Sequence, residues 1–421
     1  MKPWRSEAFV RIVLAAAIVL LAGAASQLRA EAPAARSFST AGLARVSALL
    51  DDAVAAGRIP GAILLIQQHG KPALYRKFGQ RNVAAAQPMT DDTIFRLYSM
   101  SKPITSVAAM MLVDDGKLAL DDPVARYIPA FADMQVGVPQ ADSKLALQPL
   151  ARPITVRDLL RHTSGITYGF YGSSPVRRLY AEAGLFDGDP DNAQFAERLA
   201  RLPLAEQPGT RWDYGHSTDV LGRVIEAASG RSLYQFEKER LLDPLGMRDT
   251  AFFVADHARR PLIAEPLPGD WFDRPVAGII EATAPRRWES GGAGMVGTIG
   301  DYARFAQMLL NGGELEGRRY LKRETVALMA SDQLDGADGI ARDPEFYFPG
   351  SDSSFGLGFA VRTRAKPPLP AGEYRWDGVG GTFFFIDPAD DMFVICMMQS
   401  PSQRGPIQDE LKRLVYEAMG R

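Results

Sequence analysis

Residues 95–103, FRLYSMSKP, contain a Ser-x-x-Lys tetrad that runs from Ser99 to Lys102 at the start of a helix expected over residues 101–115. Side chains three positions apart share one face of a helix, so the amine of Lys102 can approach the hydroxyl of Ser99. Proline is tolerated in the first helical turn, so Pro103 places Ser99 at or near the helix start. The tetrad therefore indicates a serine nucleophile activated by a lysine. Because a solvated helix start can have the same residues, this interpretation depends on motifs further along the chain.

Composition and charge narrow the class of protein. The chain has 421 residues, 46% of them hydrophobic and 23% charged, which is typical of a globular protein with one large or two ordinary domains. Its formal net charge is −2 and it has no run rich in Lys or Arg, so we expect no nucleic-acid partner. The four histidines lack the spacing of metal ligands, and we expect neither a metal site nor another cofactor.

The N-terminus has the layout of a secretory signal peptide, residues 1–30. An uninterrupted apolar stretch, residues 12–25, follows three basic residues and is short for a membrane span. Cleavage after Ala30 would lower the net charge of the mature chain from −2 to −5, and Ala24 marks a second candidate cleavage region. We therefore expect a periplasmic or secreted protein with no stable membrane insertion; an uncleaved N-terminal membrane anchor is the alternative. The three basic residues are Lys2, Arg5 and Arg11.

Both ends of the chain have patterns typical of a layered sheet protein. A helix is expected over residues 40–56, followed by a β-hairpin of strands 63–68 and 73–78. Toward the C-terminus four strands are expected before a helix over residues 407–419. Cys396, the only cysteine, falls in the last of them, where it is expected to be buried and forms no intrachain disulfide. The four strands are residues 355–363, 372–376, 382–387 and 391–399.

The middle of the chain, residues 118–287, is expected to be a mainly helical insertion with Pro- and Gly-rich loops. The predicted fold is α+β, an α/β sandwich in which an antiparallel sheet built from the N- and C-terminal segments is flanked by helices. Its α/β part covers about residues 38–117 and 288–420. A further helix is expected over residues 300–311 and a surface loop over residues 332–354. The helical segments of the insertion are residues 155–161, 192–201, 218–229 and 233–241.

A second motif, PGTRWDYGHS at residues 208–217, presents Tyr214 on a turn before a helix. A phenolate or a phenol close to both Ser99 and Lys102 can relay protons, since a nearby ammonium group favours the tyrosinate. Taken alone, the motif is more simply explained by a tyrosine buried for packing.

A third motif, WDGVGGT at residues 376–382, stands immediately before an apolar strand. Glycines let a backbone edge approach a substrate closely, and backbone N–H groups there can face a developing oxyanion. An ordinary glycine-rich hairpin turn is the alternative explanation.

Together and in this order, the three motifs resemble those of the serine β-lactamase and penicillin-binding-protein superfamily. The class C-like branch, which includes the family VIII esterases, is the closer match. The resemblance covers about residues 38–420 and implies the β-lactamase/transpeptidase-like fold. Other segments support it in register: LDDPV at 120–124, ITVRDLLRHTSG at 154–165, and residues 291–310.

The resemblance also implies a role for each matching residue. Ser99 would be the acyl-accepting nucleophile, and Lys102 its base or proton partner. Tyr214 matches the tyrosine of the superfamily's Y-x-N motif and would share the base role. The backbone amides of Ser99 and Val379 would form the oxyanion hole. The residues placed at the substrate are His216, Trp376 and Gly378.

Two departures from the β-lactamase pattern bear on the substrate. His216 stands where β-lactamases usually have the asparagine of Y-x-N, and Trp376 stands where they have the lysine of K-T-G. The second change removes a cation suited to a β-lactam carboxylate. Esterases of this branch often carry such an aromatic residue, so the resemblance implies a serine hydrolase that cleaves small-molecule carboxylic esters through an acyl-enzyme.

Several alternatives remain open. They are a β-lactamase or D-alanyl-D-alanine carboxypeptidase-like enzyme acting on an amide, an acyltransferase, and a non-catalytic homologue that binds the cell wall. Around the site, we expect His162 to order a loop rather than act as a base, and Ser101 to be structural. Three aromatic residues either line the acyl pocket or simply pack together: Tyr168, Phe170 and Tyr171.

Overall fold

The computed structural model describes residues 36–421 apart from four internal gaps. The chain divides into two units, residues 1–38 and 39–421, and the second contains every element discussed below. The predicted signal peptide lies outside the described residues. Within the described part of the chain, no helix has the length and apolar character needed to cross a membrane. The gaps are residues 141–143, 271–280, 336–339 and 343–351.

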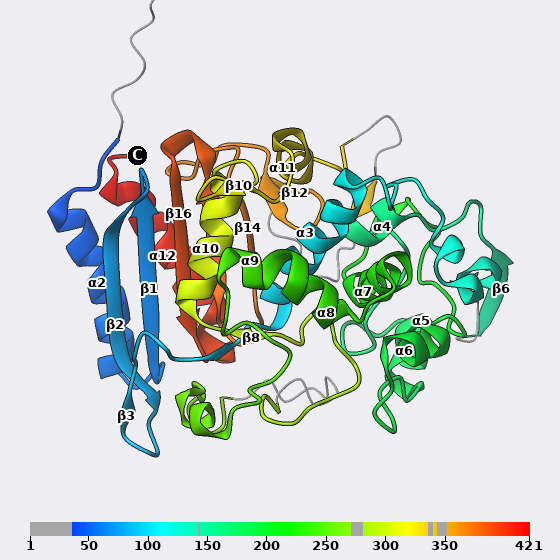
Figure 1. Cartoon of the computed structure of the whole chain (residues 1–421), viewed down its shortest axis with the longest axis horizontal. Coiled ribbons are helices and arrows are strands. Elements are labelled where there is room, and N and C mark those ends of the chain that lie inside the picture. The colour runs from blue at the N-terminus through cyan, green and yellow to red at the C-terminus, as the bar shows by residue number, and fades with distance from the viewer. Residues whose placement is uncertain (1–35, 141–143, 271–280, 336–339, 343–351) are drawn as a thin grey trace, which may run out of the picture. The chain divides into compact units, whose positions relative to one another are not determined.

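An eight-stranded antiparallel sheet forms the framework of the second unit (Figure 1). Its strand order is β12-β13-β14-β15-β16-β1-β2-β3, so the last strand of the chain pairs with the first. In this pairing Leu64 stands opposite Cys396, and both residues are fully buried. The prediction of one antiparallel sheet built from both ends of the chain is confirmed. The strands are β1 (Gly61–Gln68), β2 (Lys71–Asn82), β3 (Gln87–Pro88), β12 (Ser353–Phe355), β13 (Ala360–Arg362), β14 (Tyr374–Asp377), β15 (Phe383–Asp387) and β16 (Met392–Met398).

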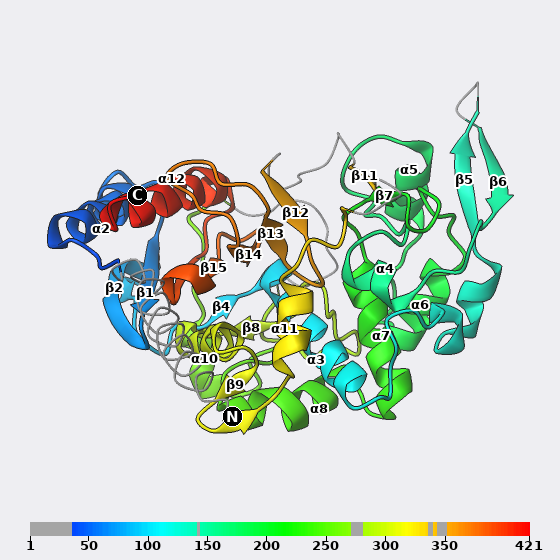
Figure 2. The same ribbon diagram turned by 90° about the horizontal axis from the view of Figure 1, so that it is seen from above.

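Helices cover both faces of this sheet (Figure 2). On one face α2 (Thr40–Ala55) packs against α12 (Arg404–Ala418), and on the other α10 (Ile299–Leu310) lies against β15 and β16. Ser39 caps α2, because its Oγ accepts a hydrogen bond from the backbone N–H of Gly42 at 3.0 Å. The packing of α2 against α12 joins the two terminal segments of the chain in one layer.

A group of helices around α7 (Ser217–Ser229) packs beside the sheet layers. This helix contacts α3 (Ser101–Asp114), which follows the tetrad, and three shorter helices. Because Tyr214 lies three residues before the start of α7, the contact between α7 and α3 brings the first and second motifs together. The other helices of the unit are α4 (Val156–Leu160), α5 (Pro175–Glu182), α6 (Asn192–Leu199), α8 (Leu233–Glu237), α9 (Asp243–Leu245) and α11 (Arg323–Met329).

Small two-stranded pairings join loops outside the main sheet. In the chain β4, which pairs with β8, ends shortly before the tetrad, and β7 lies within the second motif. The pairs are β4 (Phe95–Arg96) with β8 (Val296–Gly297), β5 (Gln135–Pro139) with β6 (Leu145–Pro149), β7 (Arg211–Trp212) with β11 (Ala341–Arg342), and β9 (Glu314–Leu315) with β10 (Arg318–Arg319).

Three expectations differ from the structure. The strand expected over residues 355–363 is two short strands, β12 and β13, which pair with each other, because Gly358 takes a positive φ of 98° in the turn between them. The hairpin of β5 and β6 lies in a region that we expected to be mainly helical. The predicted surface loop at 332–354 falls partly outside the described residues, and its end is buried because Ser353 and Ser354 enter β12.

Candidate active site

Ser99 lies in a single 3₁₀ turn, Tyr98–Met100, which runs directly into α3. The preceding residue, Tyr98, has a φ of +47°, which is uncommon for a residue with a side chain. Ser99 itself is half-buried. It therefore lies at the start of α3, as the tetrad and Pro103 predicted.

The amine of Lys102 is buried in the site; the residue is 1% exposed. Burial lowers the pKa of Lys102 to about 7, although the negative charges of Asp219 and Asp377 oppose this shift. Near neutral pH a substantial fraction of the side chain is therefore an uncharged amine that can accept a proton. Its Nζ donates hydrogen bonds to three oxygens: Ser99 Oγ at 3.2 Å, Tyr168 Oη at 3.2 Å and the carbonyl oxygen of Gly292 at 2.7 Å.

Tyr214 is buried between β7 and α7, and the centre of its ring lies 4.6 Å from Lys102 Nζ. Burial raises the pKa of Tyr214 well above its ordinary value, and contacts with Ser99 and Trp376 lower it only in part. A nearby ammonium group favours the tyrosinate, but desolvation of the phenolate has the larger effect on the pKa of Tyr214. In this arrangement Tyr214 is a neutral phenol that can donate a proton.

The glycine turn of the third motif packs against the residues just before Ser99. A Cβ atom on Gly378 would collide with the carbonyl oxygen of Leu97, and one on Gly380 would lie 2.5 Å from the ring of Tyr98. Glycine is therefore required at both positions for the two backbones to approach each other. The contact places Val379, which lies between the glycines, next to the segment that carries Ser99.

His216 and Trp376, both predicted at the substrate, are buried in the walls of the site. The Nδ1 atom of His216 lies 2.8 Å from Asp219 Oδ2, and its ring makes an edge-to-face contact with Tyr168 at 4.5 Å between centroids. The Trp376 ring lies 5.4 Å from that of Tyr214. The predicted substrate contacts of these residues and of Gly378 stay predictions.

In the loop that carries Tyr168, Phe170 and Tyr171, the aromatic rings pack on one another. Tyr168 stacks on Phe170 at 4.6 Å, and Phe170 contacts Tyr171 at 4.5 Å.

His162 is buried with a φ of +56°, and its carbonyl oxygen accepts from the backbone N–H of Asp213. Burial, together with the charge of Lys102, lowers the pKa of His162 well below its ordinary value. These contacts agree with the prediction that His162 orders a loop.

The structure thus brings Ser99, Lys102 and Tyr214 together, with the Gly378–Gly380 turn beside them. Sequence reasoning missed Asp219 and Gly292 as partners of this group. Asp219 lies two residues after the second motif and Gly292 lies inside a supporting segment, but neither position carries a signal that predicts their contact with each other.

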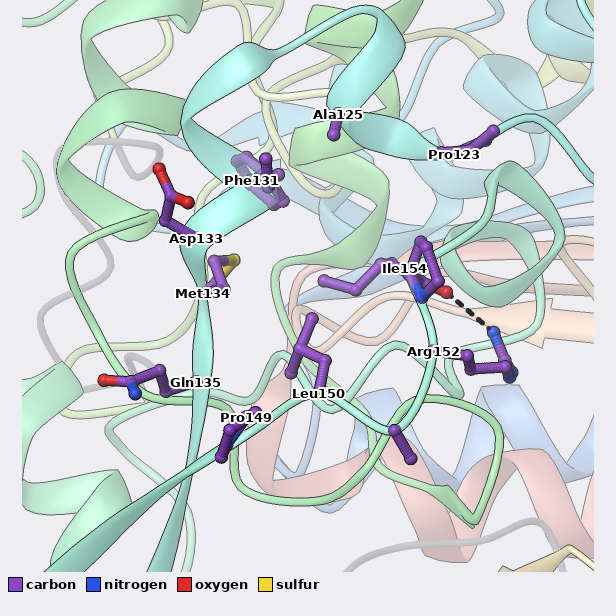
Figure 3. Close-up of a pocket in the computed structure, with 13 residues that line it drawn as sticks. Pro123, Ala125, Phe131, Asp133, Met134, Gln135, Pro149, Leu150, Arg152 and Ile154 are labelled. Atoms are coloured by element: carbon purple, nitrogen blue, oxygen red, sulfur yellow. Dashed lines mark hydrogen bonds between the residues drawn. The ribbon is translucent and has the colours of Figure 1, made fainter.

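A pocket of about 500 Å³ lies in another part of the described chain (Figure 3). Apolar side chains form much of its wall, and Arg152 at its edge is held by both carboxylate oxygens of Asp158, at 2.6 and 2.9 Å. The tetrad and Tyr214 do not line this pocket, so it is separate from the candidate active site. Its apolar lining includes Pro123, Phe131, Met134, Leu150 and Ile154.

Comparison with known proteins gives the family of this fold and site. A model of the beta-lactamase family matches residues 46–417. The chain belongs to the beta-lactamase family. Esterase EstB of Burkholderia gladioli is 32% identical over 412 residues, which cover 91% of this chain and 98% of EstB. Protein Rv1367c of Mycobacterium tuberculosis strain H37Rv is 38% identical over 353 residues, which cover 82% of this chain and 86% of that protein.

Among solved structures, one described as "EstCE1, a hydrolase with promiscuous acyltransferase activity" aligns with a TM-score of 0.74. It is 28% identical, and the alignment covers 90% of this chain and 98% of EstCE1. The β-lactamase/transpeptidase-like fold implied by the three motifs is therefore confirmed. This beta-lactamase family member is an esterase-like serine hydrolase.

Proposed function

We propose that the enzyme cleaves uncharged carboxylic esters through an acyl-enzyme on Ser99, with Lys102 and Tyr214 as its proton-transfer pair. The observation that carries this proposal is the 3.2 Å contact between Lys102 Nζ and Ser99 Oγ in a site where burial makes the lysine a base near neutral pH. The distance between these two atoms and the lowered pKa of the lysine both support Ser99 as the nucleophile and Lys102 as its base.

In the acylation step, Ser99 Oγ attacks the ester carbonyl carbon while its proton passes to the neutral amine of Lys102. The backbone N–H groups of Ser99 and Val379 stabilise the oxyanion that forms. When the intermediate collapses, the carbon–oxygen bond to the alcohol breaks, and the departing oxygen takes a proton from the phenol of Tyr214. The proton held by Lys102 then restores Tyr214.

Deacylation follows the reverse path with water as the attacking group. Water gives one proton to Lys102 through Tyr214 as its oxygen bonds to the acyl carbon, and the bond between that carbon and Ser99 Oγ breaks. Ser99 recovers its proton from Lys102, and the carboxylic acid leaves. No group outside these three side chains and water is needed to balance the protons.

The aromatic walls support esters rather than β-lactams as substrates. Trp376 occupies the position of the β-lactamase lysine and lies among the rings of Tyr214 and Phe355. This wall suits an apolar group and lacks the cation that would pair with a substrate carboxylate.

Hydrolysis of a short p-nitrophenyl ester by matched serine variants tests the proposal. Ser99→Ala should lose turnover while keeping the wild-type melting temperature. Ser101→Ala is the control, because its hydroxyl is two residues away and accepts from the backbone N–H of Met295 at 3.1 Å. Retained turnover in Ser99→Ala would overturn the proposal, and nitrocefin cleavage as fast as ester cleavage would instead favour a β-lactamase.

Acyl transfer to an alcohol is a second candidate, because EstCE1 is described as a hydrolase with promiscuous acyltransferase activity. An acyl-enzyme does not by itself select water as the acceptor. Adding a small alcohol to the ester assay should then divert acyl groups into a new ester at the expense of free acid. Product ratios that do not respond to the alcohol would exclude this candidate.

Export from the cytoplasm is proposed on the sequence of residues 1–30, with its basic start and apolar stretch. Expression of the full chain in a bacterial host should yield a mature protein that begins near residue 31 or residue 25. An intact N-terminus in the membrane fraction would favour the anchor instead.

A further inference from the structure

Asp219 is a buried carboxylate that takes no part in the bond-making steps proposed above. It contacts Gly292, whose carbonyl oxygen accepts a hydrogen bond from Lys102. Asp219 lies in the first turn of α7 and is 3% exposed. Burial tends to raise the pKa of Asp219, but the hydrogen bond from His216 and the charge of Lys102 lower it overall, so the group is an anion. Three partners surround it: His216 Nδ1 at 2.8 Å, Ser290 Oγ at 2.6 Å and the backbone N–H of Gly292 at 3.0 Å.

The peptide unit of Gly292 connects this carboxylate to the catalytic lysine. Its N–H donates to Asp219 Oδ1, and its carbonyl oxygen accepts from Lys102 Nζ at 2.7 Å. The fit is tight, because a Cβ atom on Gly292 would lie 3.0 Å from both carboxylate oxygens of Asp219. The neighbouring carbonyl of Gly291 accepts from Thr105 Oγ1, one helical turn beyond Lys102, at 3.0 Å.

His216 fixes the other oxygen of the carboxylate. An ionised carboxylate is an acceptor only, so Nδ1 of His216 carries the proton of this contact. Edge-to-face contacts with Tyr168 and Phe195 hold the imidazole ring in place. His216 therefore orients one oxygen of the Asp219 carboxylate. The other oxygen accepts the hydrogen bond from the backbone N–H of Gly292.

We propose that Asp219 is a positioning residue of the esterase site: its carboxylate fixes the Gly292 peptide so that the carbonyl oxygen holds Lys102 beside Ser99. This inference rests on the proposed function, because it assigns Asp219 to the support of the base in that reaction. In the same proposal, His216 orients the carboxylate of Asp219 and so acts on the lysine indirectly.

The charge of Asp219 has a separate, measurable effect on the lysine. Asp219 and Asp377 raise the pKa of Lys102 against the larger effect of burial. An asparagine at position 219 keeps an oxygen for Ser290 and Gly292 but removes the charge, so the pKa of Lys102 should fall. Among the described residues, the variant retains four other titratable groups that contact Lys102 or interact with its charge: Asp377, His162, Tyr168 and Tyr214.

The rate of Ser99 labelling by a fluorophosphonate probe, measured as a function of pH, tests the proposal. In Asp219→Asn the midpoint of the acid limb should move down by roughly 1 pH unit. In Asp219→Ala the plateau should fall by about 10- to 100-fold, because the lysine loses its fixed position. Melting temperatures establish that each variant is folded, and Asp219→Asn, which conserves side-chain volume, carries the test if Asp219→Ala does not fold.

Asp387→Asn is the matched control. Asp387 is fully buried and accepts hydrogen bonds from the backbone N–H of Ala389 at 3.0 Å and from Tyr416 Oη at 3.2 Å, at the opposite end of β15 from the glycine turn. Its variant should keep both the wild-type midpoint and plateau.

Folded Asp219 variants with the wild-type midpoint and plateau would overturn the inference. Ser99→Ala in the same assay separates this failure from failure of the proposed function. If Ser99→Ala is unlabelled, the nucleophile assignment stands whatever the Asp219 variants do. If it is labelled at the wild-type rate, the proposed function itself fails.

Discussion

The hydroxyl of Thr382 donates a hydrogen bond to the carbonyl oxygen of Leu97 at 3.3 Å, which joins the glycine turn near the C-terminus to the segment that carries Ser99. The two residues are 285 positions apart in the chain. Because the turn and the nucleophile come from distant parts of the chain, formation of the candidate oxyanion hole depends on the complete fold.

A side chain at Gly378 should separate these two segments. Gly378→Ala places a methyl group against the carbonyl oxygen of Leu97, so the turn has to move away from Ser99. We expect kcat for a p-nitrophenyl ester to fall by about 100-fold or more, the cost of losing one oxyanion donor. Gly405→Ala is the control, because a Cβ atom there meets no neighbour within 4 Å. Unchanged kcat in folded Gly378→Ala would contradict the assignment of Val379.

Ester hydrolysis should depend on deprotonation of Lys102. Burial holds the pKa of this residue at about 7, so kcat/KM should decline as the pH falls through about 7 and the amine becomes an ammonium. Lys102→Arg, which stays protonated, should lose activity by about 100-fold or more. A pH profile of kcat/KM for the wild-type enzyme checks the first statement. An acid limb near the pKa of an ordinary carboxyl group would point to a different base.

The hydroxyl of Tyr214 should matter for proton transfer rather than for folding. Tyr214→Phe keeps the buried ring but removes the phenolic proton, so kcat should decrease by about 100-fold with little change in melting temperature. Tyr374→Phe is the control, because Tyr374 is also buried and lies on β14 with its ring against Phe359. Equal kcat in the two variants would show that Tyr214 only packs.

Stability should depend on a buried carboxylate between the sheet and α12. Burial tends to raise the pKa of Glu373, but Lys412, Arg375 and Arg362 lower it to about 2. Glu373 therefore contributes stability above its unfolded pKa of about 4.3, and this contribution is lost as the pH falls through about 2. Glu373→Gln should lower the free energy of unfolding at neutral pH by about 3–5 kcal/mol.

Denaturant titration of Glu373→Gln measures this free energy, with Glu314→Gln as the comparison. Glu314 pairs with Arg319 on the surface, so its loss should cost about 1 kcal/mol or less. Equal losses in the two variants would show that burial of the Glu373 cluster has no effect on stability.

Local sequence patterns predicted the parts of this molecule that depend on neighbouring residues. Ser99 and Lys102 meet because they are three positions apart on one chain segment, and the helix expected over residues 40–56 is present as Thr40–Ala55. Pairing of the terminal strands was predicted from their order and apolar character. The resemblance to a known superfamily then joined the three motifs into one site.

Local sequence patterns could not predict contacts that form only in the folded chain. Asp219 accepts a hydrogen bond from the N–H of Gly292, 73 positions further along the chain. The sequence left open whether Tyr214 is a phenol or a phenolate, because the desolvation that raises its pKa depends on the whole folded site. The strand expected at 355–363 failed for a local reason, the turn at Gly358, that the apolar pattern concealed.

The central claim is that the acyl group of an ester substrate is transferred to Ser99. Rapid mixing with a p-nitrophenyl ester, acid quenching and peptide mass analysis would measure this directly. We expect a mass increase equal to the acyl group on the peptide that contains Ser99, and none in Ser99→Ala. An acyl group on another residue, or continued ester cleavage by Ser99→Ala, would contradict it.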